Sequence, residues 1–145
     1  MNDHIHYFKI GNAYQLQDEE YSLIVDIAPI ADIHTPLVSL VREGDKARLT
    51  IRRFFCWDGC SGPTIDDDTN MRGCMIHDAL YYLLRMGMLD LGWRYAVDRE
   101  LYKAMLQDCA PRFRATYYQW AVNEFALKAA VTPRQLYVAP KRKLD

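Results

Sequence analysis

A histidine and several carboxylates lie close together near the middle of the chain. His77 and Asp78 are adjacent, and they follow a glycine-rich turn at residues 57–63 and an acidic run at residues 66–68. Backbone carbonyls and a carboxylate are hard oxygen ligands that suit calcium, and a neighbouring histidine can act as a general base. The pattern predicts a calcium-assisted hydrolase with His77 as its base. The candidate calcium ligands are Asp58, Gly59, Ser61, Gly62 and Asp78.

The spacing after the acidic run is helical. Four residues fall at i, i+3, i+7 and i+10 on one apolar stripe: Cys74, His77, Tyr81 and Leu84. A second helical pattern, from about residue 95 to residue 107, carries Asp98 on its buried stripe. A buried carboxylate without a polar partner is unfavourable, so we expect Asp98 to contact and orient His77. The contact requires an asymmetric connector, because a symmetric helix pair would offset the two residues by about 7 Å.

The remaining segments predict an α+β fold, in which a small N-terminal antiparallel sheet is followed by three helices. Residues 37–41 and 47–55 alternate like strands and flank turn residues 42–46, which indicates a β-hairpin. The third helix should run from Pro111 to about residue 130, with its apolar face made by Phe113, Tyr117, Trp120 and Ala121. We expect one domain over residues 1–132, divided into a β-rich part (1–56), a loop (57–69) and a helical part (70–132), with a tail at 133–145.

The composition is that of a globular protein with no global electrostatic preference. Of 145 residues, 50% are apolar, and the net charge is -1, so we predict no nucleic-acid partner. Residues 1–6 lack the basic and apolar regions of a signal peptide, and no apolar run approaches the roughly 20 residues that span a bilayer. The sequence therefore predicts synthesis and retention in the cytoplasm and no transmembrane segment. The four cysteines form no Cys-x-x-Cys pairs, which argues against a zinc ribbon.

The helical motif resembles the active-site helix of the secretory phospholipase A2 enzymes. The matching pattern is Gly-Cys-x-x-His-Asp-x-x-Tyr at residues 73–81, and Asp98-Arg99 is similar to the Asp-Arg of their second helix. The resemblance covers residues 58–105. It implies that Asp98 backs His77, that Tyr81, with Tyr117 or Tyr118, hydrogen-bonds Asp98, and that calcium activates a phospholipid or other ester. It also implies a disulfide between Cys60 and Cys74.

A second resemblance extends over most of the chain. Trp-Asp-Gly-Cys-Ser-Gly-Pro at 57–63, His-Asp-Ala-Leu-Tyr at 77–81 and Ala-Val-Asp at 96–98 resemble a family carried by tailed phages and prophages, whose pattern is WDGASGP, HDxLY and AxD. This resemblance implies a phage-encoded product made in the host cytoplasm. A further expectation is association with the virion, where other virion proteins would be its partners. The turn at 57–63 departs from the calcium loop of phospholipase A2 in two ways. The repeated glycines of that loop are reduced to Gly59 and Gly62, and Pro63 stiffens the turn.

Three other functions compete with a phospholipase-like esterase. The His-Asp network could be the buried polar core of a virion or assembly component that catalyses nothing. Asp-Gly-Cys-Ser-Gly at 58–62 resembles the motif of cell-wall cysteine peptidases, but Pro63 disfavours the helix that their cysteine begins. A His-Asp metal phosphohydrolase needs further helical histidines, whereas His4, His6 and His34 lie in the β-rich part. Solvent access to His77 discriminates the esterase from the structural component.

Overall fold

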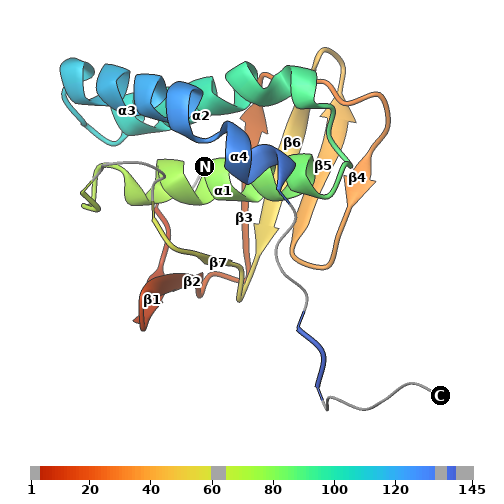
Figure 1. Cartoon of the computed structure of the whole chain (residues 1–145), viewed down its shortest axis with the longest axis horizontal. Coiled ribbons are helices and arrows are strands. Elements are labelled where there is room, and N and C mark those ends of the chain that lie inside the picture. Colours follow the sequence, from red (N-terminus) through yellow and green to blue (C-terminus); the bar gives the residue numbers. More distant parts are fainter. Residues whose placement is uncertain (1–3, 60–64, 133–136, 140–145) are drawn as a thin grey trace.

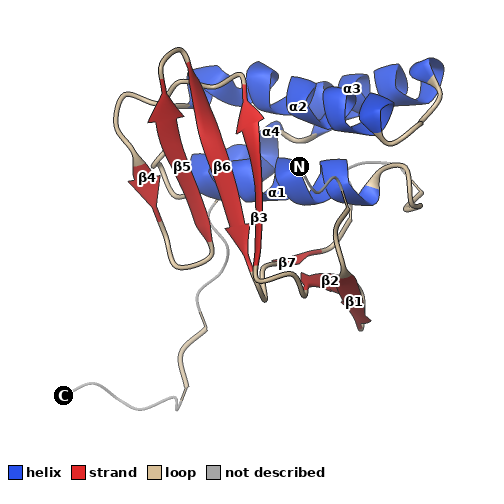
Figure 2. Ribbon diagram, turned by 180° about the vertical axis from the view of Figure 1, so that it is seen from behind, coloured by secondary structure: helices blue, strands red, loops and turns tan. Residues whose placement is uncertain are grey.

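The computed structural model describes residues 4–59, 65–132 and 137–139. Its β-rich N-terminal half packs against a helical C-terminal half, so the α+β class predicted from the sequence is confirmed (Figure 1). Figure 2 shows the helices gathered on one side of the larger sheet. Among the described helices, none is long and apolar enough to cross a membrane.

The larger sheet has four antiparallel strands in the order β3-β6-β5-β4. These are β3 (Glu20–Val25), β4 (Ile33–His34), β5 (Val38–Glu43) and β6 (Lys46–Arg52). β5 and β6 form the predicted hairpin, with Gly44 in the left-handed conformation (φ 69°) that its tight turn requires. Ala47, Leu49 and Ile51 alternate inward along β6 and are fully buried, as the period of two predicts. This buried face is the platform for the helices.

A second, smaller sheet is distinct from the first, and its last strand leads into the glycine-rich turn. Its order is β1-β2-β7, comprising β1 (Tyr7–Ile10), β2 (Ala13–Leu16) and β7 (Cys56–Trp57). Trp57 is 1% exposed and packs against the rings of Tyr14 and Phe55. The buried indole thus fixes the point at which the turn begins.

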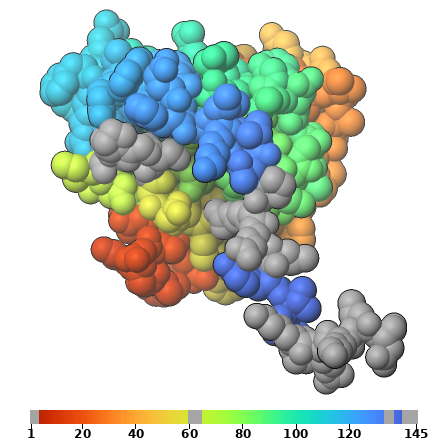
Figure 3. Space-filling view, in the orientation of Figure 1, coloured from red at the N-terminus to blue at the C-terminus, as the bar shows by residue number. Residues whose placement is uncertain are grey.

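Over residues 65–132, the structure has four α-helices where the sequence predicted three. They are α1 (Met71–Arg85), α2 (Arg94–Gln107), α3 (Arg112–Phe125) and α4 (Leu127–Val131), with a 3-10 turn η1 (Leu91–Trp93) before α2. The predicted third helix is interrupted at Ala126, where α3 ends and the short α4 begins. α2 packs against both α1 and α3, and α4 packs against α1. In the space-filling view, α3 and α4 lie on the face turned to the reader (Figure 3).

The apolar face predicted for α3 is wrong. Phe113, Tyr117 and Trp120 are 78%, 41% and 51% exposed, and of the four predicted residues Ala121 alone is buried. α3 instead packs through Ala115, Tyr118, Ala121 and Val122. The small alanine side chains let the backbone of α3 approach its neighbours closely, and the large aromatic residues that dominate the hydrophobic pattern remain on the surface.

Gly73 lies where α1 packs tightly against Leu101 and Ala104 of α2. A Cβ atom at this position would be 2.9 Å from Leu101 Cδ1 and 3.3 Å from the Leu101 carbonyl oxygen. We expect Gly73→Ala to lower the free energy of unfolding by about 1–3 kcal/mol, because overpacking outweighs the gain of up to about 1 kcal/mol in helix propensity. Urea denaturation measures the change. Gly92→Ala is the matched control, since its nearest contact would be an ordinary 3.5 Å; equal stability of the two variants would contradict the close crossing.

Candidate active site between helices α1 and α2

His77 on α1 and Asp98 on α2 face each other across the helix pair. His77 Nε2 and Asp98 Oδ1 are 2.7 Å apart. The side chains are 2% and 0% exposed. The contact predicted from the two helical stripes is therefore present, and the connector that contains η1 supplies the asymmetry that the contact required.

Tyr81 completes the polar contact from the next turn of α1. Its hydroxyl donates to the same Asp98 Oδ1 at 2.7 Å, and its ring stacks on the His77 ring with centroids 4.1 Å apart. Burial and then the charge of Asp98 raise the pKa of Tyr81 well above its ordinary value of 10.0, while the nearby Arg94 guanidinium acts in the opposite direction. Tyr81 thus stays protonated and remains a hydrogen-bond donor at neutral pH.

This arrangement assigns the tautomer of His77. A carboxylate oxygen accepts, so Nε2 carries the proton that it donates to Asp98, and the lone pair is on Nδ1. Within the described part of the chain, no hydrogen bond reaches Nδ1. The free lone pair is the one that a general base uses, and Asp98 is placed to stabilise the imidazolium that would form.

Arg94 is a fourth member of this network that sequence reasoning missed. It lies one helical turn before Asp98 on α2, and its Nη1 is 3.8 Å from Asp98 Oδ2. The same nitrogen donates to the Asn123 carbonyl on α3 at 3.0 Å. Burial lowers the pKa of Arg94, but the adjacent Tyr81 and Asp98 raise it more, so the pKa lies above its ordinary value. The i,i+4 spacing of an arginine and an aspartate is the sequence signal that could have revealed this pair.

Asp78, the next residue after His77, lies outside the buried network. It is partly exposed and lines a cavity of about 400 Å³ whose walls include Phe54, Phe55, Tyr82 and Met86. Among the described residues that line this cavity, His77 does not appear. The structure therefore places the two adjacent residues of the motif on different surfaces of α1.

The residues predicted to bind calcium are only partly described. Asp58 is exposed, and Ser61 and Gly62 lie outside the described residues. The carboxylate that packs on Gly59 is Asp66, which would be 2.5 Å from a Cβ atom there and which accepts a hydrogen bond from Tyr14 at 2.9 Å. Over residues 4–59, 65–132 and 137–139, no three His, Cys, Asp or Glu side chains gather as a metal-binding group. The calcium site therefore stays a prediction.

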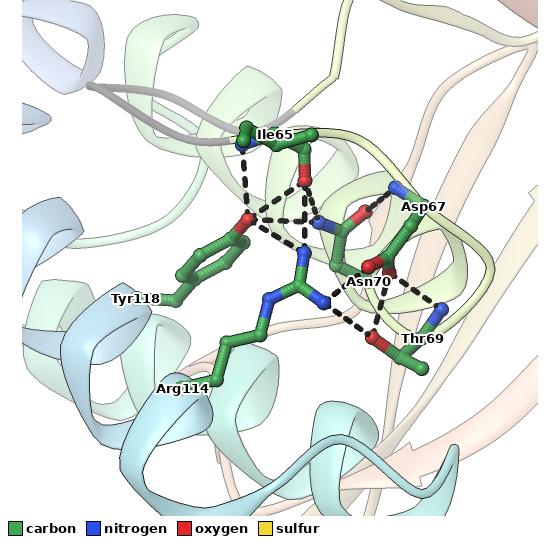
Figure 4. Close-up of polar contacts among 6 residues, drawn as sticks. All are labelled: Ile65, Asp67, Thr69, Asn70, Arg114 and Tyr118. Atoms are coloured by element: carbon green, nitrogen blue, oxygen red, sulfur yellow. Dashed lines mark hydrogen bonds and ion pairs between the residues drawn. The ribbon is translucent and has the colours of Figure 1, made fainter.

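The segment that leads from the turn into α1 is held by α3 (Figure 4). Six residues form this contact: Ile65, Asp67, Thr69, Asn70, Arg114 and Tyr118. The Tyr118 hydroxyl donates to the Ile65 carbonyl at 2.7 Å, and Arg114 Nη2 donates to the same oxygen at 3.1 Å. Tyr118 thus contacts this segment, and Tyr81 is the tyrosine that reaches Asp98.

Arg114 also forms an ion pair with Asp67, the middle residue of the acidic run. Asp67 Oδ1 in addition accepts hydrogen bonds from the backbone and hydroxyl of Thr69. Asp67 is therefore not a solvated charge at the helix start. Its carboxylate anchors residues 65–70 to α3 and so fixes where α1 begins.

Asp67 makes the stability of the fold depend on pH. Burial raises its pKa, but Thr69 and Arg114 outweigh burial and hold the pKa below its ordinary value of 3.8. A lowered folded-state pKa stabilises the fold above pH 3.8, and this stabilisation is lost as the pH falls through the folded value. Because Asp67 is 33% exposed, Asp67→Asn should cost only about 1 kcal/mol at pH 7.

Urea unfolding of wild type and Asp67→Asn between pH 7 and pH 3 measures this contribution. The difference in unfolding free energy should shrink below about pH 4, once the wild-type carboxylate is protonated. Asp68→Asn, at the exposed neighbouring position, is the control and should change little. A difference for Asp67→Asn that stays constant down to pH 3 would contradict a role for its charge.

The predicted disulfide involves Cys60, which lies outside the described residues. Cys74 is buried on α1, and Cys56 and Cys109 are exposed free thiols. The pairing of Cys60 with Cys74 therefore stays a prediction.

Comparison of the chain with protein-family models, with curated proteins and with solved structures finds no match. The resemblances to the phage family and to phospholipase A2 therefore stay hypotheses.

Proposed function

We propose that this protein is a phage-encoded, phospholipase-like esterase in which His77 is the general base. The observation that carries the proposal is the 2.7 Å contact between His77 Nε2 and Asp98 Oδ1, which leaves the Nδ1 lone pair of His77 available for a proton. An acid that orients a histidine through one ring nitrogen prepares the other nitrogen for catalysis.

The reaction follows from this arrangement. His77 Nδ1 removes a proton from a water molecule, whose oxygen attacks the carbonyl carbon of an ester. Asp98 and Tyr81 keep the ring in place while it carries the added charge. The tetrahedral intermediate collapses, the bond from carbon to the alkoxy oxygen breaks, and the imidazolium returns its proton to that oxygen. The products are a fatty acid and a lysophospholipid when the ester belongs to a phospholipid.

In this proposal, calcium held by Asp78 and by carbonyls around Gly59 to Gly62 would polarise the ester carbonyl. Every proton transfer above is made by His77.

A second candidate function is favoured by the burial of the network. His77 and Asp98 are 2% and 0% exposed, as expected for a polar core that fixes the packing of two helices. In this alternative the protein is a non-catalytic virion or assembly component that docks on other virion proteins.

Product analysis tests the proposal. Purified protein is incubated with phosphatidylcholine or phosphatidylglycerol vesicles and with a soluble short-chain ester, in millimolar calcium or in chelator, and the products are identified by mass spectrometry. We expect equimolar fatty acid and lysophospholipid in calcium and a large loss of both in chelator. Absence of product from every ester, with the protein folded by circular dichroism, would favour the structural alternative.

A further inference from the structure

Phe54 lines the cavity beside Asp78 and has an unfavourable backbone conformation. Its φ is 77°, in the left-handed region that a bulky residue rarely adopts, and the residue is 57% exposed. Its amide donates to the Leu16 carbonyl at 2.9 Å, a bond that glycine would make equally well and without strain. Strained residues cluster at ligand sites, so an exposed aromatic ring at this position indicates a role in binding.

The cavity lies between the C-terminal half of α1 and the turn that joins β6 to β7. Its volume of about 400 Å³ falls within the range of small-molecule sites. Most of the described residues that line it are apolar or aromatic: Leu37, Phe54, Phe55, Tyr82 and Met86. These walls suit a hydrocarbon chain, and the unbranched Met86 side chain can adapt to one.

Two charged residues of α1 also line the cavity, and they give its two ends opposite charges. Asp78 and Arg85 stand at i and i+7, so they share a face of the helix and lie about 10 Å apart along its axis. An anion at Arg85 is therefore separated from the Asp78 carboxylate by roughly one Debye length at physiological salt. A guanidinium is weakly hydrated and matches the two oxygens of a carboxylate, so Arg85 is suited to hold the acidic end of an apolar ligand.

We propose that this cavity binds a free fatty acid, with the hydrocarbon chain against Phe54 and Tyr82 and the carboxylate at Arg85. The strained turn keeps the Phe54 ring at the cavity, where it covers apolar surface of the chain. His77 is not among the described residues that line the cavity. Fatty-acid binding is therefore independent of the proposed function and holds whether or not the protein hydrolyses esters.

The two exposed free thiols provide the measurement. Cys56 lines the cavity, and Cys109 does not. Wild-type protein is alkylated with N-ethylmaleimide in increasing decanoate, below its micelle concentration, and the rate at each cysteine is read by peptide mass spectrometry. We expect decanoate to slow alkylation of Cys56 and to leave Cys109 unchanged. Along a series of chain lengths, affinity should rise roughly threefold per methylene until the cavity is full and then level off.

Phe54→Gly tests the aromatic wall and the strain together. The affinity for decanoate, measured as the concentration that half-protects Cys56, should fall by about tenfold because the ring no longer covers the chain. The urea midpoint should stay equal or rise, because glycine adopts a φ of 77° without strain. Cys109→Gly is the matched control: it relieves a φ of 67° elsewhere and should leave the protection of Cys56 unchanged.

Arg85→Gln tests the charged end of the ligand. Loss of the guanidinium should weaken decanoate binding roughly tenfold and leave decanol, which has no charge, unaffected. Arg99→Gln, at an exposed position of α2, is the control and should bind decanoate like wild type.

Three results would overturn the inference. The first is equal protection of Cys56 and Cys109, or protection of neither, in wild type. The second is unchanged decanoate affinity in folded Phe54→Gly. The third is decyltrimethylammonium that protects Cys56 as well as decanoate does, since the charged contact would then lie at Asp78 and the ligand would be a cation. Selective protection by decanoate in a protein that hydrolyses no ester would sustain this inference and refute the proposed function alone.

Discussion

Replacing Asp98 with alanine should lower the free energy of unfolding by about 3–5 kcal/mol. The substitution removes the acceptor of His77 Nε2 and of the Tyr81 hydroxyl and leaves the Arg94 guanidinium without its buried counter-ion. An unpaired charge and two unsatisfied donors in a buried site are among the few causes of so large a loss. Urea unfolding followed by tryptophan fluorescence measures it.

Two further variants make this result specific. Asp98→Asn retains an oxygen that can accept one hydrogen bond but lacks the charge, so its loss should lie between wild type and Asp98→Ala. Asp68→Ala removes an exposed aspartate and should leave stability within about 0.5 kcal/mol of wild type. A loss below about 1 kcal/mol for Asp98→Ala would mean that the network contributes little to the fold.

The core of the site could be predicted because helical periodicity decides which residues share a face. His77 and Tyr81 are four residues apart, so both had to lie on the buried stripe of one helix, and Asp98 occupied the matching stripe of the next. Two polar residues on facing apolar stripes can satisfy each other only by meeting. The hairpin of β5 and β6 was equally local, since the turn at Gly44 fixes its register.

Contacts between distant segments could not be predicted in the same way. Asp67 and Arg114 are 47 residues apart, and no periodicity links the acidic run to α3. The exposed aromatic face of α3 was mispredicted because hydrophobicity marks both a packed stripe and a surface stripe, and the smaller residues Ala115 and Ala121 gave the weaker signal. The i,i+4 spacing of Arg94 and Asp98 lies within α2, but the burial of Arg94 and its contact with the Asn123 carbonyl depend on how α3 packs against α2, which the sequence of α2 does not specify.

Replacing His77 with glutamine should lower the rate of ester hydrolysis by about 10² to 10⁴, the range typical for loss of a general base. Glutamine is the chosen substitute because its amide nitrogen can still donate a hydrogen bond to Asp98 Oδ1, which His77 Nε2 contacts at 2.7 Å. The buried carboxylate thus keeps a partner, while the side chain loses the basic nitrogen that would accept a proton from water. The loss should appear in kcat, because the base acts in the chemical step and not in substrate binding.

The matched control is His34→Gln, which makes the same substitution at an exposed position on β4. It should leave both the rate and the fold unchanged. Circular dichroism and urea unfolding of each variant establish that a rate difference does not arise from unfolded protein.

The catalytic role of His77 is tested most directly by the initial rate of fatty-acid release from phospholipid vesicles in calcium, measured side by side for wild type, His77→Gln and His34→Gln. Wild type and His34→Gln should release fatty acid at the same rate, and folded His77→Gln should be slower by a factor of at least about 10². Equal rates for all three folded proteins would contradict a catalytic His77 and leave the His77, Asp98 and Tyr81 contact as a structural core.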